Sequence, residues 1–248
     1  MAKGEEFVCG VHAVLAALAR GKERALRLIV ASGRGGEAAR RARFLAESAG
    51  VSIETLPPAR LSEFVATSNH QGMVLRVRPT PVLDLETLLA RQPPGRPPLL
   101  LLDGIQDPRN LGALFRTAAA LGAGGAVWPK DRASGLTPTV AKAAAGALES
   151  LPLARVTNMA RAVSAVKDRG YWAVAGDPEG ENTLGETPLP APAALVLGAE
   201  GRGIRRLVRE RCDAGVRITL SGSIVGSLNV VVAAAIFLFA MGACGESP

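Results

Sequence analysis

From Leu99 onwards, short apolar strand patterns alternate with helical patterns, and this alternation limits the possible folds more than any other feature. The expected strands are Leu99–Leu102, Ala126–Trp128, Leu153–Val156, Tyr171–Ala175, Ala194–Leu197 and Val216–Leu220. The expected helices are Leu111–Leu121, Pro138–Leu148, Met159–Asp168, Ile204–Arg211 and Leu228–Met241. Strands rich in Val, Leu and Ile that alternate with helices indicate a parallel sheet covered on both faces.

A smaller α/β pattern precedes this segment. Its expected helices are Gly10–Ala19, Glu37–Ala49 and Leu61–Ala66, and its expected strands are Ala25–Val30, Val51–Leu56 and Met73–Val77. Six prolines then lie between Pro79 and Pro98, around a brief helical pattern at Leu83–Ala90. Because proline lacks an amide donor and restricts its predecessor, this stretch resists regular structure. We expect a small domain over residues 1–78, a proline-rich linker over residues 79–98 and a larger domain over residues 99–248.

The balance of charge indicates a polyanionic partner. The 248 residues carry a formal charge of +7, which suits nucleic acid or an anionic membrane, although an idle basic surface stays possible. Three widely separated cysteines and two histidines do not suggest a disulfide framework or a metal site. The uncharged run between Arg217 and Glu246 is purely apolar only over Val230–Ala240, which is too short to cross a bilayer. With no apolar leader in MAKGEEFVCG, we expect a cytoplasmic protein.

Familiar nucleotide and hydrolase motifs are absent from the sequence. There is no P-loop, no G-x-G-x-x-G after the first strand of either segment, and no G-x-S-x-G elbow. NTPase, dehydrogenase and serine-hydrolase functions therefore have no support.

Three loop segments remain as candidates for chemistry, each following a predicted strand. LDGIQDPRNLGALFR (102–116) leads into a helix near Asn110, where free amide donors suit an anion, although Asn110 is also an ordinary helix cap. LVLGAEGRG (195–203) is a glycine-rich turn around Glu200, which lets a ligand approach the backbone. ITLSGSIVGSLNVVV (218–232) places Asn229 at the start of an apolar helix, where a buried amide needs partners. Ligands of open α/β sheets bind beyond the carboxyl ends of the strands, where such loops gather.

The order and spacing of these segments resemble the signature motifs of the SpoU branch of the SPOUT methyltransferase superfamily. DPRNLGALFR, LGAEGRGI and SLNVVVAAAIFLF carry the match. VCGVHAVLAAL and NHQGMVLRV in the first segment resemble that branch's L30e-like substrate-binding domain. The arrangement is most similar to the 23S rRNA guanosine-2′-O-methyltransferases.

The resemblance implies a trefoil-knotted α/β domain, a homodimer and S-adenosyl-L-methionine as methyl donor. It implies a catalytic set of Asn110, Arg116, Glu200, Ser227 and Asn229. It implies that the donor lies against Gly198, Ala199, Gly201, Ile218, Leu220 and Leu228. Where the family reads Ile-Pro-Met, Thr219 and Leu220 follow Ile218, and the loop at 221–226 is one residue longer, which predicts an altered donor loop.

The implied reaction methylates a ribose 2′-hydroxyl, a very weak acid, so catalysis must align the oxygen and stabilise developing negative charge. Arg116 can do this as a fixed cation or as a general base, and the first role is physically easier because a guanidinium hardly deprotonates. A 2′-hydroxyl target means RNA and not DNA, and the candidate RNA contacts are Arg40, Arg41, Arg43, Arg60, Arg76 and Arg78. A tRNA methyltransferase, a resistance-type rRNA methyltransferase and a non-catalytic RNA-binding protein remain alternatives.

Overall fold

The computed structural model describes residues 6–65, 70–186, 188–221 and 227–242. Two compact units divide the chain. Unit 1 consists of residues 1–81 together with residues 144–150, and unit 2 consists of residues 82–143 and 151–248. Within the described ranges, no helix is long and apolar enough to span a membrane.

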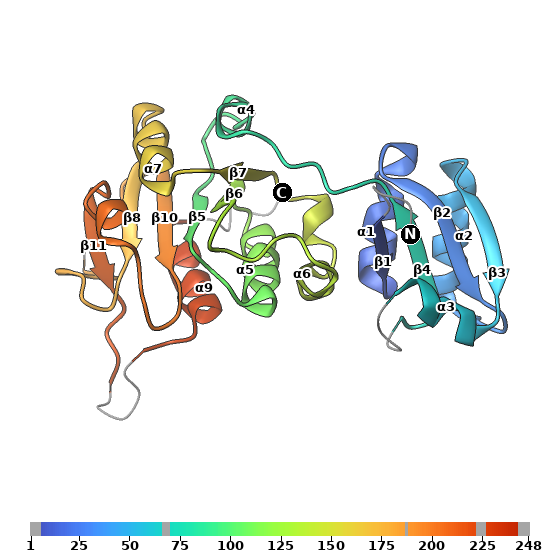
Figure 1. The fold of residues 1–248 in the computed structure, drawn as a ribbon. Helices are drawn as coiled ribbons and strands as arrows, with labels where there is room; N and C mark the ends of the chain where they lie inside the picture. The colour runs from blue at the N-terminus through green and yellow to red at the C-terminus, as the bar shows by residue number, and fades with distance from the viewer. Residues whose placement is uncertain (1–5, 66–69, 187, 222–226, 243–248) are drawn as a thin grey trace. The chain divides into compact units, whose positions relative to one another are not determined.

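Unit 1 is built on a four-stranded mixed sheet in the order β1-β4-β2-β3 (Figure 1). Its elements are β1 (Glu6–Cys9), α1 (Val11–Ala19), a 3-10 turn (Gly21–Glu23), β2 (Ala25–Ala31), α2 (Glu37–Ser48), β3 (Ser52–Leu56), α3 (Pro58–Phe64), β4 (Met73–Val77) and a second 3-10 turn, Ala147–Glu149. Strands β2 and β3 are parallel, and β4 runs antiparallel to both β1 and β2.

The two faces of this sheet carry different helices, because successive side chains of a strand point to opposite faces. Leu28 and Val30 of β2 pack in one cluster with Ala42 and Ala46 of α2. Ile29 and Ala31 of the same strand pack in the other cluster with Leu61 of α3. Helix α2 therefore lies on the face opposite to α3.

Unit 2 is built on a seven-stranded sheet in the order β7-β6-β5-β10-β8-β11-β9, and every neighbouring pair is parallel. The strands are β5 (Leu99–Asp103), β6 (Gly125–Pro129), β7 (Leu153–Val156), β8 (Trp172–Gly176), β9 (Asn182–Thr183), β10 (Ala193–Gly198) and β11 (Ala214–Arg217). The helices are α4 (Leu85–Ala90), α5 (Pro108–Ala120), α6 (Pro138–Ala144), α7 (Met159–Asp168), α8 (Arg206–Arg209) and α9 (Val230–Ala240). The expected α/β fold with a parallel sheet is confirmed.

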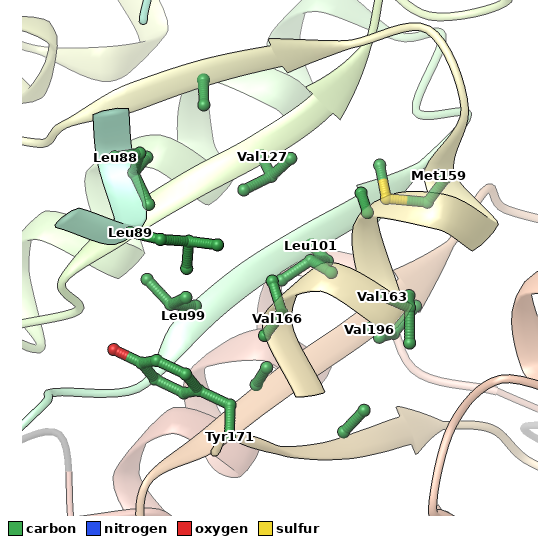
Figure 2. Close-up of a cluster of buried hydrophobic side chains, with 14 of the residues drawn as sticks. Leu88, Leu89, Leu99, Leu101, Val127, Met159, Val163, Val166, Tyr171 and Val196 are labelled. Atoms are coloured by element: carbon green, nitrogen blue, oxygen red, sulfur yellow. The ribbon is translucent and has the colours of Figure 1, made fainter. Parts of the chain in front are cut away.

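Helices cover both faces of this sheet. Leu101 of β5 and Val127 of β6 pack against Val163 and Val166 of α7, in the cluster drawn in Figure 2. On the other face, the ring of Phe115 in α5 meets the edge of Trp128, the residue that follows Val127, at 5.5 Å between ring centroids. Helix α9 packs beside α5 on that same face. The two layers bury β5 and β6 at every position and β10 at all but its last residue, which explains why these central strands are almost entirely apolar.

Several predicted boundaries were wrong, and two strands were not predicted. Strands β1 and β9 are short, and neither has a clear apolar alternation. The helix predicted over Pro138–Leu148 ends at Ala144, because Ala145 and Gly146 have φ of 48° and 99°. The last predicted strand, Val216–Leu220, is found at Ala214–Arg217. The knot implied by the resemblance depends on the path of residues 218–229, of which 222–226 lie outside the described residues, so it stays a prediction.

Candidate active site

The central strands β5 and β10 end side by side. Gly198, the last residue of β10, is the register partner of Asp103, the last residue of β5. In a parallel sheet, the loops that leave these carboxyl ends share one edge. Two of the three motif segments therefore start from the same point of the sheet.

The first loop runs from β5 into α5. Asp107 caps this helix by accepting a 2.7 Å hydrogen bond from the amide of Arg109, and Pro108 occupies the first turn. Proline suits that position because its missing N–H would have no partner within the helix. Asn110 follows in the first turn and is half-buried. Because Asp107 caps the helix, the side chain of Asn110 is not needed as a cap and is available to the site.

The glycine-rich loop after β10 folds back on itself. The amide of Gly203 donates a 2.8 Å hydrogen bond to the carbonyl of Ala199. Gly201 and Gly203 have φ of 76° and 65°, the left-handed region that glycine tolerates. A Cβ added to Gly198 would lie 2.0 Å from the carbonyl carbon of Gly203, so only glycine fits there. The closed loop presents Glu200 to solvent.

The third segment reaches this loop through Asn229, the N-cap of α9. Its Oδ1 accepts a 2.9 Å hydrogen bond from the amide of Val231 and so caps the helix. Its Nδ2 donates to Glu200 Oε1 at 2.9 Å and lies 3.5 Å from Asn110 Oδ1, at the limit of a hydrogen bond. One amide therefore joins residues from all three motif segments.

Two predicted catalytic residues do not join this cluster through a hydrogen bond between described residues. Ser227 is exposed, two residues before Asn229. Arg116 is exposed on α5, six residues after Asn110. Six residues of an α-helix correspond to about 9 Å of rise and a rotation of roughly 120° from Asn110. The guanidinium thus belongs to a different part of the helix surface from the Asn110 amide.

The sequence did not identify Asp103 and Arg205 as site residues. The side chain of Asp103 is fully buried and accepts hydrogen bonds from the amide, Nε and Nη2 of Arg205, at 2.9, 2.9 and 2.5 Å. The hydrogen bond to Asp103 raises the pKa of Arg205 above its ordinary value, against the smaller effect of desolvation. This ion pair fixes the return of the glycine-rich loop to the end of β5. A charged residue that closes a strand of otherwise apolar residues was the available signal.

The residues predicted to hold the donor lie around the same edge. Gly198, Ala199 and Gly201 belong to the closed loop. Ile218, Leu220 and Leu228 are half-buried and lie outside regular helices and strands. Residues 218–220 make no backbone hydrogen bond with another described residue. Half-buried apolar side chains, beside backbone groups that make no such bond within the described residues, fit an adenosine, which needs an apolar wall and polar backbone partners. Most of the altered loop, residues 222–226, lies outside the described residues.

The predicted RNA contacts lie in unit 1, on different faces. Arg40 and Arg41 are exposed on α2. Arg43, on the same helix, is half-buried and donates a 3.2 Å hydrogen bond to Thr55 of β3. Arg76 is half-buried in β4, in register between Phe7 and Arg27. Alternation along β4 places it with Val74 on the α3 face of the sheet.

Comparison with known proteins identifies the family of this chain. The model of the SpoU rRNA Methylase family matches residues 97–239, and the model described as RNA 2′-O ribose methyltransferase substrate binding matches residues 7–82. The chain is 42% identical over 240 residues to the 23S rRNA (guanosine-2′-O-)-methyltransferase RlmB of Shewanella oneidensis, covering 96% of each chain. It is 38% identical over 241 residues to the putative TrmH family tRNA/rRNA methyltransferase YacO of Bacillus subtilis, again covering 96% of each.

Solved structures give the same result for the fold. The SpoU methyltransferase AviRb of Streptomyces viridochromogenes, solved in complex with the cofactor AdoMet, has a TM-score of 0.78 at 27% identity, covering 96% of this chain and 89% of that one. The resemblance inferred from the three loop segments is confirmed. Because both family models match, and relatives align along nearly their whole length, the chain belongs to the SpoU rRNA methylase family.

Proposed function

We propose that this protein transfers the methyl group of S-adenosyl-L-methionine to the ribose 2′-oxygen of a guanosine in 23S rRNA, in the cytoplasm. The observation that carries the proposal is the meeting of Asn110, Glu200 and Asn229 at the carboxyl edge of β5 and β10. The guanosine and the 23S rRNA come from relatives that are about 40% identical along nearly the whole chain.

The donor site is proposed at the closed loop and the residues beside it. Ile218, Leu220 and Leu228 would hold the adenosine. Its polar partners would be the backbone groups of residues 218–220, which make no backbone hydrogen bond with another described residue. When bound, the donor supplies a methyl group on a positively charged sulfur, which leaves as a neutral thioether. The closed turn at Gly198 keeps side chains away from the backbone there.

The chain's own residues must orient the 2′-hydroxyl. They must also stabilise the negative charge that develops on the 2′-oxygen as its proton leaves to solvent. The Asn229 amide holds Glu200 in place, and the second carboxylate oxygen of Glu200 has no hydrogen bond with a described residue. That oxygen can accept a hydrogen bond from a ribose hydroxyl. A fixed guanidinium beside the 2′-oxygen would stabilise its negative charge and bind the adjacent phosphate, which is the role proposed for Arg116.

The placement of Arg116 supports a shared site in a homodimer. Within one chain its guanidinium is not hydrogen-bonded to the cluster of Asn110, Glu200 and Asn229. Helix α9, which packs beside α5, carries three exposed apolar side chains, Val232, Ile236 and Phe239, the last 68% exposed. A second copy that covers this apolar surface would bring α5 of one protomer toward its partner. We propose that Arg116 acts in the partner's site.

The proposed substrate-binding domain covers residues 1–78, followed by a linker at residues 79–98. The family model for substrate binding, which matches residues 7–82, supports rRNA recognition by this part of the chain. Two alternatives are a methyltransferase specific for tRNA and one specific for a resistance site of rRNA. The identity of the RNA that becomes labelled in the test below distinguishes both from this proposal.

The test is methyl transfer from labelled S-adenosylmethionine to 23S rRNA transcripts, followed by digestion to nucleosides. Wild-type protein is expected to produce 2′-O-methylguanosine. Asn229→Asp keeps the helix-capping oxygen but replaces the amide donor with a carboxylate facing Glu200, so its activity is expected to fall at least about a hundredfold. Label on a base, or label only on tRNA, would refute the reaction or the substrate. Donor binding without transfer to any RNA would favour the non-catalytic alternative.

A further inference from the structure

Helix α2 exposes a phenylalanine among arginines. Phe44 is 67% exposed, whereas Ala39, Ala42 and Ala46 of the same helix are buried against unit 1. Arg40 and Arg41 precede Phe44 by four and three residues, so all three share the solvent side of the helix. We call Arg40, Arg41 and Phe44 the α2 surface. Because it is exposed, the ring of Phe44 is open to contact with a partner.

The two arginines are not neutralised. Neither Arg40 nor Arg41 makes an ion pair or a side-chain hydrogen bond with a described residue, whereas Arg43 on the same helix bonds to Thr55. Glu37 and Glu47 are exposed near the two ends of α2 and limit the surface along the helix. Between them, the centre of the helix offers two free guanidinium groups and one aromatic ring.

This combination suits an unpaired nucleotide. Sequence-tolerant recognition of single-stranded RNA combines stacking of a base on an aromatic side chain with cationic contacts to the backbone. A paired base inside a helix does not expose its face for stacking. A phosphopeptide would use the arginines but would leave the ring of Phe44 without a partner.

We propose that the α2 surface binds an unpaired base of the RNA, stacked on Phe44, with Arg40 and Arg41 on the flanking phosphates. This proposal rests on RNA being the substrate, as proposed above. It narrows the RNA contacts of unit 1 to one face of the sheet. Arg76 lies on the opposite face, as does Arg60 of α3, whose Nε forms a 3.0 Å ion pair with Glu63.

Binding of full-length protein to two RNA probes tests the proposal. One probe is a fluorescent twelve-nucleotide single strand, and the other is the same sequence in a blunt duplex. Phe44→Ala is expected to weaken single-strand binding about tenfold and to leave duplex binding unchanged, because a stacked base is lost only from the single strand. Phe44→Trp is expected to retain binding. Phe44→Leu keeps an apolar side chain but is expected to behave like alanine.

The arginines are tested by salt dependence. Arg40→Ala should lower the slope of log affinity against log salt by about one for the single strand, because one phosphate contact is lost. Arg60→Ala is the matched control, an exposed arginine of the same unit on the opposite face, and its slope should equal that of the wild type.

Four results would overturn the proposal. Unchanged single-strand binding by Phe44→Ala would exclude stacking, and an equal loss on both probes would mean a general defect. A change in sedimentation without a change in RNA binding would assign the α2 surface to contacts between copies of the chain. Methyl transfer by the wild-type protein is a separate test of the proposed function. Failure of the stacking proposal can therefore be distinguished from failure of the proposed reaction. Wild-type protein that binds neither probe would remove this proposal together with the RNA-binding part of that function.

Discussion

Asp103 and Arg205, 102 residues apart in the sequence, join the end of strand β5 to the return of the glycine-rich loop. The carboxylate is fully buried, and the guanidinium that pairs with it is half exposed. Three donors of Arg205 bind this carboxylate. This one residue therefore offsets the cost of burying the negative charge of Asp103. The pair therefore sets where Glu200 lies relative to the sheet.

Arg205→Ala removes the guanidinium and leaves the buried carboxylate of Asp103 with one of these three donors, the backbone amide of residue 205. We expect the free energy of unfolding to fall by about 2–4 kcal/mol, because an uncompensated buried charge is costly. Arg206→Ala is the matched control, since Arg206 is exposed and forms a 2.8 Å ion pair with Glu210, the C-cap residue of α8. That change is expected to cost about 0.5 kcal/mol or less. Urea unfolding of both variants compares them, and equal losses would show that the Asp103 pair contributes little.

Alanine substitutions at Gly198 and Gly201 distinguish a steric clash in the loop from backbone strain in the loop. Gly198→Ala places a Cβ 2.0 Å from the carbonyl carbon of Gly203, so the loop must move away from β5. Gly201→Ala meets nothing within 4 Å and introduces only the strain of a φ of 76°, about 1 kcal/mol. Calorimetric titration with S-adenosylmethionine is expected to detect binding by Gly201→Ala and none by Gly198→Ala. Normal affinity of Gly198→Ala would mean that the closed loop does not form the donor site.

Cys212 is expected to resist alkylation in the folded protein. Burial, reinforced by the nearby carboxylate of Asp213, raises the pKa of its thiol to about 12. At pH 8 the thiolate fraction is then on the order of one in ten thousand, so iodoacetamide should not label the residue. Peptide mass spectrometry is expected to find Cys212 labelled only in urea. Because the folded pKa lies above the unfolded one, the contribution of this thiol to stability is complete at neutral pH and is lost as the pH rises above about 9. Rapid labelling of native protein at pH 8 would contradict this assignment.

The sequence predicted the architecture of unit 2 because its central strands are almost entirely apolar and helices such as α5 and α7 are amphipathic. It did not predict β9, a two-residue strand, or the interruption after Ala144, which depends on left-handed backbone at Ala145 and Gly146. The glycine at 146 was a visible signal for such a break. Helix α3 starts at Pro58, three residues before the predicted start. This start was predictable from the sequence, because proline favours the first helical turn.

The convergence of Asn110, Glu200 and Asn229 came from the resemblance, and the structure gives its physical basis in one amide with two partners. Pairing between Asp103 and Arg205 could not be predicted, because a single sequence does not reveal which of 29 basic residues meets a given buried acid. The difference between Arg40 and Arg43, one free and one bonded to β3, likewise depends on tertiary contacts.

The shared active site is tested by mixing two inactive variants. Arg116→Ala removes the guanidinium and keeps the cluster at the loop edge, whereas Asn229→Asp disrupts the cluster and keeps Arg116. Asp caps a helix as well as Asn does, so α9 is expected to keep its start in the second variant. Refolded together in equal amounts, random pairing makes about half of the dimers mixed. If Arg116 serves the partner's site, each mixed dimer contains one complete site of two, and roughly a quarter of wild-type methyl transfer returns. If Arg116 serves its own chain, no combination restores a site. An inactive mixture in which mass spectrometry confirms the heterodimer would therefore confine catalysis to one chain.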